Sequence, residues 1–210
     1  MKRLVGLALT TATASAAFYF PHFVDAPEAH AYCTSGMSRW APSSTPRTLA
    51  VDPTYPTALR SGVSAAAKQW HGVANSTLKT GYIVTSSYAS YALQSYYVWP
   101  ASLKGIVAPG FASKGGSAGS YNQTWGTAYF NPAYTWVNGS QNISAGKADV
   151  QTVAVHELGH IHGLAHPWAP HCTDGTTTSS PEEVSVMNAI NTGTRRYIMS
   201  DDRAGIAKLY

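Results

Sequence analysis

The chain has 210 residues, of which 44% are hydrophobic and only 11% charged, and its formal net charge is +4. This length suits one domain with a substantial hydrophobic core. The lysines and arginines are scattered and form no basic stripe, which argues against a nucleic-acid-binding protein. Beyond the N-terminal end, no segment of the sequence is apolar enough to span a membrane.

The N-terminal end has the pattern of a secretory signal peptide. Two basic residues precede an uncharged, largely apolar run over 4–20, which a proline ends. The alternative is an uncleaved membrane anchor, but the run is short and rich in threonine. Small-x-small cleavage sites end at Ala16 and at Ala31, and we prefer the second, which makes 1–31 the signal peptide and 32–210 the mature domain. We therefore predict a secreted, extracellular protein with no membrane attachment after cleavage.

The two cysteines of the chain are Cys33 and Cys172. In a secreted protein an even pair is most simply a disulfide. It would close a loop of about 140 residues, which the chain-entropy model makes worth roughly 4–5 kcal/mol.

The next part of the chain gives one helix signal and then several strand signals. Prolines and hydroxyl residues over 39–56 indicate extended and turn structure. Apolar residues at helical spacing predict a helix over 57–70. The glycine-rich run over 114–119 is predicted to be a flexible loop, because it lacks the Gly-Lys-Ser/Thr ending of a phosphate-binding loop. Strands are predicted over 78–85, 96–99, 105–108, 125–130 and 134–137.

One stretch, from His156 to His166, reads H-E-x-x-H-x-x-G-x-x-H with no position missing. On a helix, about 40° of rotation separates His156 from His160, so both rings project from one face. Glu157 then leans beside a metal ion as a base and not as a ligand. Gly163 can take a positive φ and end the helix, and the returning chain brings His166 up as a third ligand. Three nitrogen ligands and one open position describe a catalytic zinc site.

Helix signals surround and follow this motif. The first two histidines and the glutamate of the motif lie in a helix predicted over 149–164, with Asp149 near its positive N-terminal end. His162 is about 200° round the helix from His160, so we expect it to face away from the metal. A further helix is predicted over 200–210, with Ser200 as its N-cap and two acids in its first turn.

The eleven-residue motif resembles, residue by residue, the zinc signature of the metzincin metallopeptidases. Residues 184–189 resemble the Met-turn of that family, in which a methionine packs beneath the zinc without coordinating it. Met187 fits this role better than Met199 does. The final helix, with its Asp-Asp, Gly-Ile and Leu-Tyr pairs, is similar to that of the matrixin catalytic domain in a bacterial-type secreted form. By resemblance, Asp201 or Asp202 would pair with the mature N-terminal ammonium.

The resemblance implies an α+β metzincin fold with a twisted, mostly parallel sheet, long helices, an active-site helix, a Met-turn and a C-terminal helix. It implies one zinc ion on His156, His160 and His166, with Glu157 taking a proton from the zinc-bound water. The expected protein is a secreted zinc endopeptidase that hydrolyses internal peptide bonds. Its expected partner is an extended polypeptide that pairs with an edge strand over 125–130, and we predict a monomer.

The sequence departs from the family at several points. Pro167 replaces the usual matrixin serine after the third histidine, and Ala189 removes the tyrosine zinc ligand of astacins and serralysins. Acids and histidines are too few before the motif for the calcium and structural-zinc sites of matrixins. Cys33 is alternatively a latency thiolate, but it lacks the Arg-Cys-Gly pattern of matrix metalloproteinase propeptides. Two other functions remain open, namely a non-catalytic secreted binding module and a zinc amidase acting on cell-wall peptide.

Overall fold

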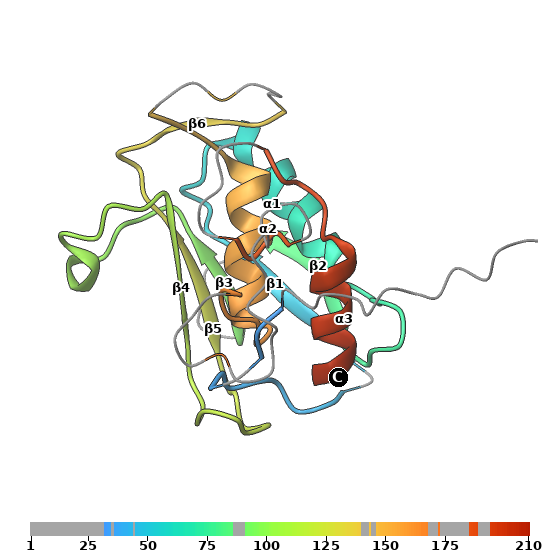
Figure 1. The fold of residues 1–210 in the computed structure, drawn as a ribbon. Coiled ribbons are helices and arrows are strands. Elements are labelled where there is room, and N and C mark those ends of the chain that lie inside the picture. The colour runs from blue at the N-terminus through green and yellow to red at the C-terminus, as the bar shows by residue number, and fades with distance from the viewer. Residues whose placement is uncertain are drawn as a thin grey trace, which may run out of the picture.

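A computed structural model describes residues 32–34, 36–43, 45–85, 91–139, 143, 146–167, 172, 185–188 and 194–210 (Figure 1). The predicted signal peptide 1–31 lies outside these residues, so its cleavage stays a prediction. Val184 and Ala189, the two ends of the predicted Met-turn segment, also lie outside them.

The frame of the described structure is a five-stranded sheet in the order β2-β1-β3-β5-β4. Neighbouring strands are parallel except at one edge, where β4 runs antiparallel to β5. A separate pair of short parallel strands, β6 and β7, precedes the second helix. The strands are β1 (Arg47–Val51), β2 (Thr80–Thr85), β3 (Leu93–Tyr96), β4 (Gly110–Lys114), β5 (Gly126–Phe130), β6 (Thr135–Val137) and β7 (Lys147–Asp149).

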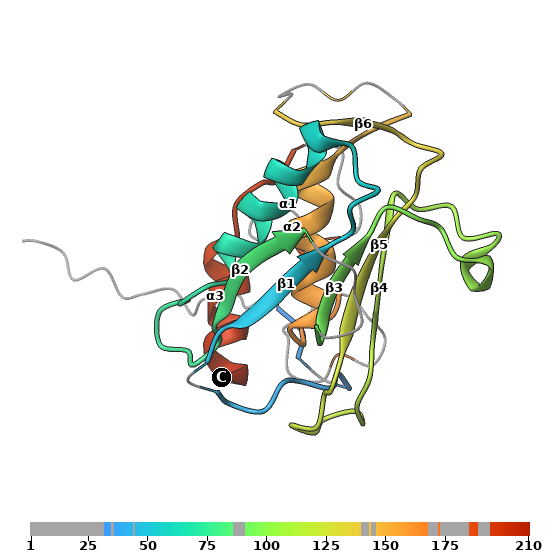
Figure 2. The ribbon, with the colours of Figure 1, turned by 180° about the vertical axis from the view of Figure 1, so that it is seen from behind.

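Two long helices, α1 (Thr57–Gln69) and α2 (Val150–Ile161), lie side by side on one face of the sheet (Figures 1 and 2). They approach closely because α1 carries Gly62, where a Cβ would lie 2.5 Å from Cγ1 of Val150. Trp70, just past α1, is fully buried, and its indole N–H donates to the carbonyl of Val155 at 3.1 Å. The hydrophobic core thus fills the space between the sheet and the two helices and holds α2 in place.

The remaining helices are short or lie at the side of this layer. A single turn of 3-10 helix, η1 (Ala101–Leu103), precedes β4, and α3 (Ser200–Leu209) lies beside the lower end of α2 (Figure 1). Ile206 of α3 is fully buried in the same core. The predicted class, an α+β fold with a mostly parallel sheet and helices, is confirmed. In the described part of the chain, no helix has the length and apolar character needed to cross a membrane.

Several predicted elements are confirmed and others shift along the chain. The helix over 57–70 and the strands over 78–85, 125–130 and 134–137 form within two residues of their expected ends. The strand expected over 96–99 forms earlier, as β3, and shares only its last residue with the prediction. β1 and β7 form strands that the sequence did not single out, because their strand character depends on pairing with β2 and β3 and with β6, respectively.

The edge of the sheet was predicted wrongly. β5 lies between β3 and β4, so the strand over 125–130 is internal, and the edge strand is β4. No strand forms over 105–108; β4 begins at Gly110 and takes in Lys114, the first residue of the predicted flexible loop. Its sequence, Gly-Phe-Ala-Ser-Lys, has little intrinsic β-propensity, and the ladder with β5 makes it a strand.

The cap of α3 also differs from the prediction. Ser200 is the first helical residue, and Met199 precedes the helix as its N-cap residue. The backbone N–H of Met199 donates to the carboxylate of Asp202 at 2.8 Å. The capping group is therefore an acid inside the first turn and not the serine hydroxyl.

Candidate metal centre

The three histidines of the motif meet at one point beside β4. His156 and His160 lie one turn apart on α2, and His166 returns to them from the segment that follows. The Nε2 atom of His156 lies 3.1 Å from those of both His160 and His166, which are 3.0 Å from each other. No other group of three such ligands occurs among the described residues.

The turn after α2 places His166 as the sequence predicts. Gly163 has a φ of +104°, and its N–H donates to the carbonyl of His160 at 3.0 Å, which ends the helix. The next residues turn back, and the N–H of Ala165 donates to the carbonyl of Cys33 at 2.7 Å. His166 is therefore positioned by a contact with a segment distant in sequence as well as by the helix end.

Hydrogen bonds fix which ring nitrogens face the centre. The Nδ1 atom of His156 lies 2.8 Å from the carbonyl of Val186, and that of His160 lies 2.9 Å from the carbonyl of Leu164. Because a carbonyl only accepts, each Nδ1 carries the proton and each Nε2 presents its lone pair. Burial lowers the pKa of His156 to about 4 and that of His160 well below its usual value. Both rings are thus neutral at pH 7, as metal binding requires.

The histidine cluster fits a tetrahedral ion. Ligand nitrogens at about 2.0–2.1 Å from a tetrahedral zinc lie about 3.3–3.4 Å apart. The 3.0–3.1 Å separations here are close to that spacing. Convergent lone pairs repel one another unless a cation lies between them, so these residues are suited to hold one metal ion.

Glu157 lies beside the histidines but outside their cluster. Its side chain is only 6% exposed and faces β4, where a Cβ on Gly110 would lie 2.7 Å from its Oε1. Burial raises the pKa of Glu157 to about 8. A cation held by the histidines would favour the charged form and bring that pKa down again.

Met187 packs against α2 at Gly159, next to the ligand His160. It is fully buried, and a Cβ on Gly159 would collide with its sulfur. Met199, the alternative for this role, is 38% exposed and lies at the N-terminus of α3. The segment around Met187 also supplies the Val186 carbonyl that holds His156.

Asp202 of α3 holds the segment around Met187 in place through hydrogen bonds. Its carboxylate accepts from the hydroxyl of Ser185 at 2.8 Å and from the N–H of Val186 at 2.9 Å. The same carboxylate accepts from the N–H of Met199. Burial raises the pKa of Asp202, while these hydrogen bonds act in the opposite direction. Asp202 thus has a structural role here, and an ion pair of Asp201 or Asp202 with the mature N-terminus stays a prediction.

The two other histidines among the described residues, His71 and His162, lie outside the cluster. His162 is fully buried on the opposite side of α2, as predicted, with its Nε2 3.2 Å from the hydroxyl of Thr80. His71 is exposed at the end of α1, and His171 lies outside the described residues.

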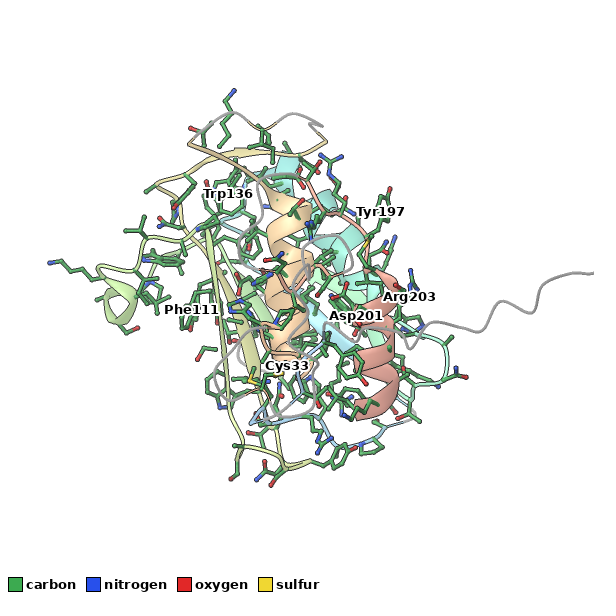
Figure 3. All side chains as sticks on the ribbon, in the orientation of Figure 1. Cys33, Phe111, Trp136, Tyr197, Asp201 and Arg203 are labelled. Carbon is green, nitrogen blue, oxygen red and sulfur yellow. A yellow bond between two sulfur atoms is a disulfide. The ribbon has the colours of Figure 1, made fainter. Side chains whose placement is uncertain are left out.

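A cavity of about 680 Å³ joins the histidines to β4 and to the first turns of α2. In Figure 3, Phe111 marks the β4 side of this region and Cys33 lies near the lower end of α2. The lining includes Met37, Gly110, Phe111, Ala112, Lys114, Thr152, Val153, His156, Glu157, His160, His166 and Asn188.

Two residues of the cavity were not predicted to belong to the site. Gly110 allows β4 to approach Glu157, and Lys114 at the other end of β4 donates from Nζ to the carbonyl of His160 at 2.6 Å. Burial lowers the pKa of Lys114 to about 7. The only sequence feature that could have pointed to Lys114 is weak: this lysine directly precedes a glycine-rich run that lacks the pattern of a phosphate-binding loop.

The two cysteines form a disulfide, as predicted. Cys33 and Cys172 are joined across 139 residues, with their Cα atoms 5.6 Å apart. The sulfur of Cys33 is therefore not available as a latency ligand of the metal. The bond ties the segment that follows His166 to the segment around Cys33.

Comparisons with known proteins identify the family of the chain. No protein of curated function matches the chain. Two solved structures of myroilysin are similar at 13% identity: one covers 81% of this chain and 82% of its own with a TM-score of 0.44, the other 88% and 96% with 0.45. The sequence model of the matrixins, peptidase family M10, matches residues 105–210, which is half of the chain and includes β4, β5, α2 and α3. The chain therefore belongs to the matrixin family.

Proposed function

We propose that the protein is a secreted, zinc-dependent endopeptidase that hydrolyses internal peptide bonds. The observation that carries the proposal is the convergence of three Nε2 atoms within 3.1 Å of one another, next to a buried glutamate in a cavity along an edge strand. Membership of the matrixin family supports one zinc ion as the cofactor, held by His156, His160 and His166.

The chain's own residues supply a base and a defined orientation for the reaction. When bound, zinc would supply Lewis-acid activation of water and of the scissile carbonyl. Glu157 is the general base: its carboxylate accepts the proton of the attacking water and then donates it to the leaving amine. The Nδ1 hydrogen bonds of His156 and His160 hold their rings in the orientation that ligation needs.

The substrate expected is an extended polypeptide. β4 has a neighbour on one side only in the described sheet, and the cavity runs along it. The backbone N–H and C=O groups on its outer side can therefore pair with an added strand. Gly110 and Lys114 mark the two ends of this strand, so β4 takes the substrate-pairing role expected of the strand over 125–130.

The test compares casein cleavage by the zinc-loaded protein with that by Glu157→Gln and His160→Ala variants, with zinc measured in each. Glu157→Gln should keep stoichiometric zinc and lose about 100- to 10,000-fold in rate, because it removes the base alone. His160→Ala should lose zinc and activity together. His71→Ala removes an exposed histidine and serves as the matched control, which should keep both.

Two outcomes would favour other functions. If the native protein binds zinc and cuts no protein substrate, a non-catalytic binding module on the same scaffold becomes the better interpretation. If it instead releases amines from cell-wall peptide, the amidase alternative is correct. A His160→Ala protein that still holds one zinc ion would contradict the ligand assignment.

A further inference from the structure

Lys114 brings a positive charge into the cavity beside the histidines. It is the last residue of β4 and lies on the face of the sheet that packs on α2. Its Nζ donates to the carbonyl of His160 at 2.6 Å and to the carbonyl of Ser38 at 2.9 Å. An ammonium has three N–H donors, so these two contacts leave one donor for another partner.

No carboxylate balances this charge within the described residues. The ion pair found there joins Arg196 to Asp149, at the other end of α2. Lys114 is partly buried and its two partners are neutral carbonyls, so the fold bears part of the desolvation cost of an ammonium without a counter-ion.

The position of Lys114 along β4 relates it to the reacting end of the cavity. Gly110 lies against Glu157, whereas Lys114 lies against the carbonyl of His160. The two are four residue steps apart along the strand, or about 13 Å at 3.3 Å per step. An extended chain paired with β4 would therefore pass Lys114 within a few residues of the bond that the water activated by Glu157 attacks.

We propose that Lys114 is a specificity-determining residue, which binds a carboxylate of the substrate and so favours polypeptides with an acidic side chain a few residues from the cut bond. This inference rests on the proposed endopeptidase function. A substrate carboxylate would provide the counter-ion that the described residues lack and would accept the third N–H of the ammonium.

The experiment measures binding separately from cleavage. Peptides based on a site that the native protein cuts in casein are made in pairs, with Glu or Gln at each of the four positions on either side of the bond. Their dissociation constants are measured by fluorescence anisotropy on zinc-loaded Glu157→Gln protein at about pH 6, where the lysine is protonated. At one position, the Glu peptide should bind about tenfold more tightly than its Gln partner.

Variants of Lys114 test whether that preference comes from its charge. In the Glu157→Gln background, Lys114→Met keeps an unbranched apolar side chain and should bring the Glu-to-Gln ratio to about one, whereas Lys114→Arg should keep most of it. Near-ultraviolet circular dichroism checks that each variant is folded. An equal loss of affinity for both peptides in Lys114→Met would mean that Lys114 only pins α2 to the N-terminal segment, and would overturn the proposal.

The two proposals fail in different ways. If the native protein cuts no peptide, the endopeptidase function fails, and the peptide pairs cannot be designed from its products. If it cuts peptides but no position shows a Glu-to-Gln preference, the endopeptidase function stands and the role of Lys114 is rejected.

Discussion

Gly110 illustrates how closely the base is packed. A Cβ at this position would lie 2.5 Å from Cγ1 of Val153 and 2.7 Å from Oε1 of Glu157, and these separations are too short for real atoms. The absence of a side chain here lets β4 lie against α2 with the carboxylate between them. The site therefore depends on the absence of a side chain at Gly110 as well as on the histidine ligands.

The first prediction follows from that contact. Gly110→Ala should push Glu157 out of position and lower the rate of peptide cleavage by about 10- to 100-fold, with stability lowered by about 1–3 kcal/mol. Cleavage kinetics and urea denaturation measure the two effects. Ser113→Ala, on the opposite face of the same strand, is the control. Normal cleavage by a folded Gly110→Ala protein would contradict the close packing.

Single residues of the site were predictable from sequence in proportion to how local their geometry is. His156, Glu157 and His160 share one helix, and Gly163 turns the chain after it, so the helical repeat alone brought them together. Gly110 and Lys114 reach the same cavity from another strand. Nothing in their local sequence specifies that they meet α2, because that meeting depends on the order of strands in the sheet.

At the scale of elements, the N-terminus of α2 depends on one buried acid. Asp149 caps the helix by accepting from the N–H of Thr152 at 2.9 Å, and it pairs with Arg196 at 2.8 Å. Burial alone would raise the pKa of Asp149, but the hydrogen bonds from Arg196 and Thr152 outweigh it and hold that pKa below its usual value. The cap of α2 is thereby linked to the segment that leads into α3.

The second prediction concerns pH. Because the pKa of Asp149 is lower in the folded than in the unfolded protein, its stabilisation is present above about pH 4 and is lost as the pH falls through the folded value. Asp149→Asn should therefore lower the free energy of unfolding of the metal-free protein by about 3 kcal/mol at pH 7, and by less near pH 3. Urea denaturation at both pH values measures this difference, with Lys147→Met as the control. An equal loss at both pH values would argue against the ion pair.

Elements differed in how far their own sequence specified them. α1, α2 and α3 carry helical periodicity or acidic first turns, and all three were predicted to within a few residues. β1 and β4 were not, because neither has an alternating pattern strong enough to separate a strand from extended loop. Their strand character comes from partners elsewhere, β2 and β3 for β1 and β5 for β4.

At the scale of the whole molecule, contacts distant in sequence hold the centre in place. The N-terminal segment is joined to the far side of the motif by the disulfide between Cys33 and Cys172, and by the hydrogen bond from Ala165 to Cys33. Lys114 adds a third connection through Ser38. The pairing of the cysteines was predictable because there were only two of them, whereas the hydrogen bonds around the disulfide were not.

The third prediction is that this disulfide supports both the fold and the metal site. Replacing both cysteines by serine should lower the free energy of unfolding by about 4 kcal/mol, because the bond closes a long loop in the unfolded chain. Zinc affinity should fall as well, since Cys33 anchors the turn that delivers His166. Urea denaturation and competition with a zinc chelator measure the two effects. Unchanged zinc affinity in the destabilised variant would show that the turn holds His166 without the bond.

The anchoring of His166 also has a consequence for the order of folding. His156 and His160 come together as soon as α2 forms, which takes about a microsecond for an isolated helix. His166 has its final place only when Ala165 meets Cys33, a contact between distant segments that forms much more slowly. A partly folded chain would thus offer a metal ion only two ligands and bind it weakly. We expect firm metal capture to come late, so that uptake of the ion reports that the polypeptide has finished folding.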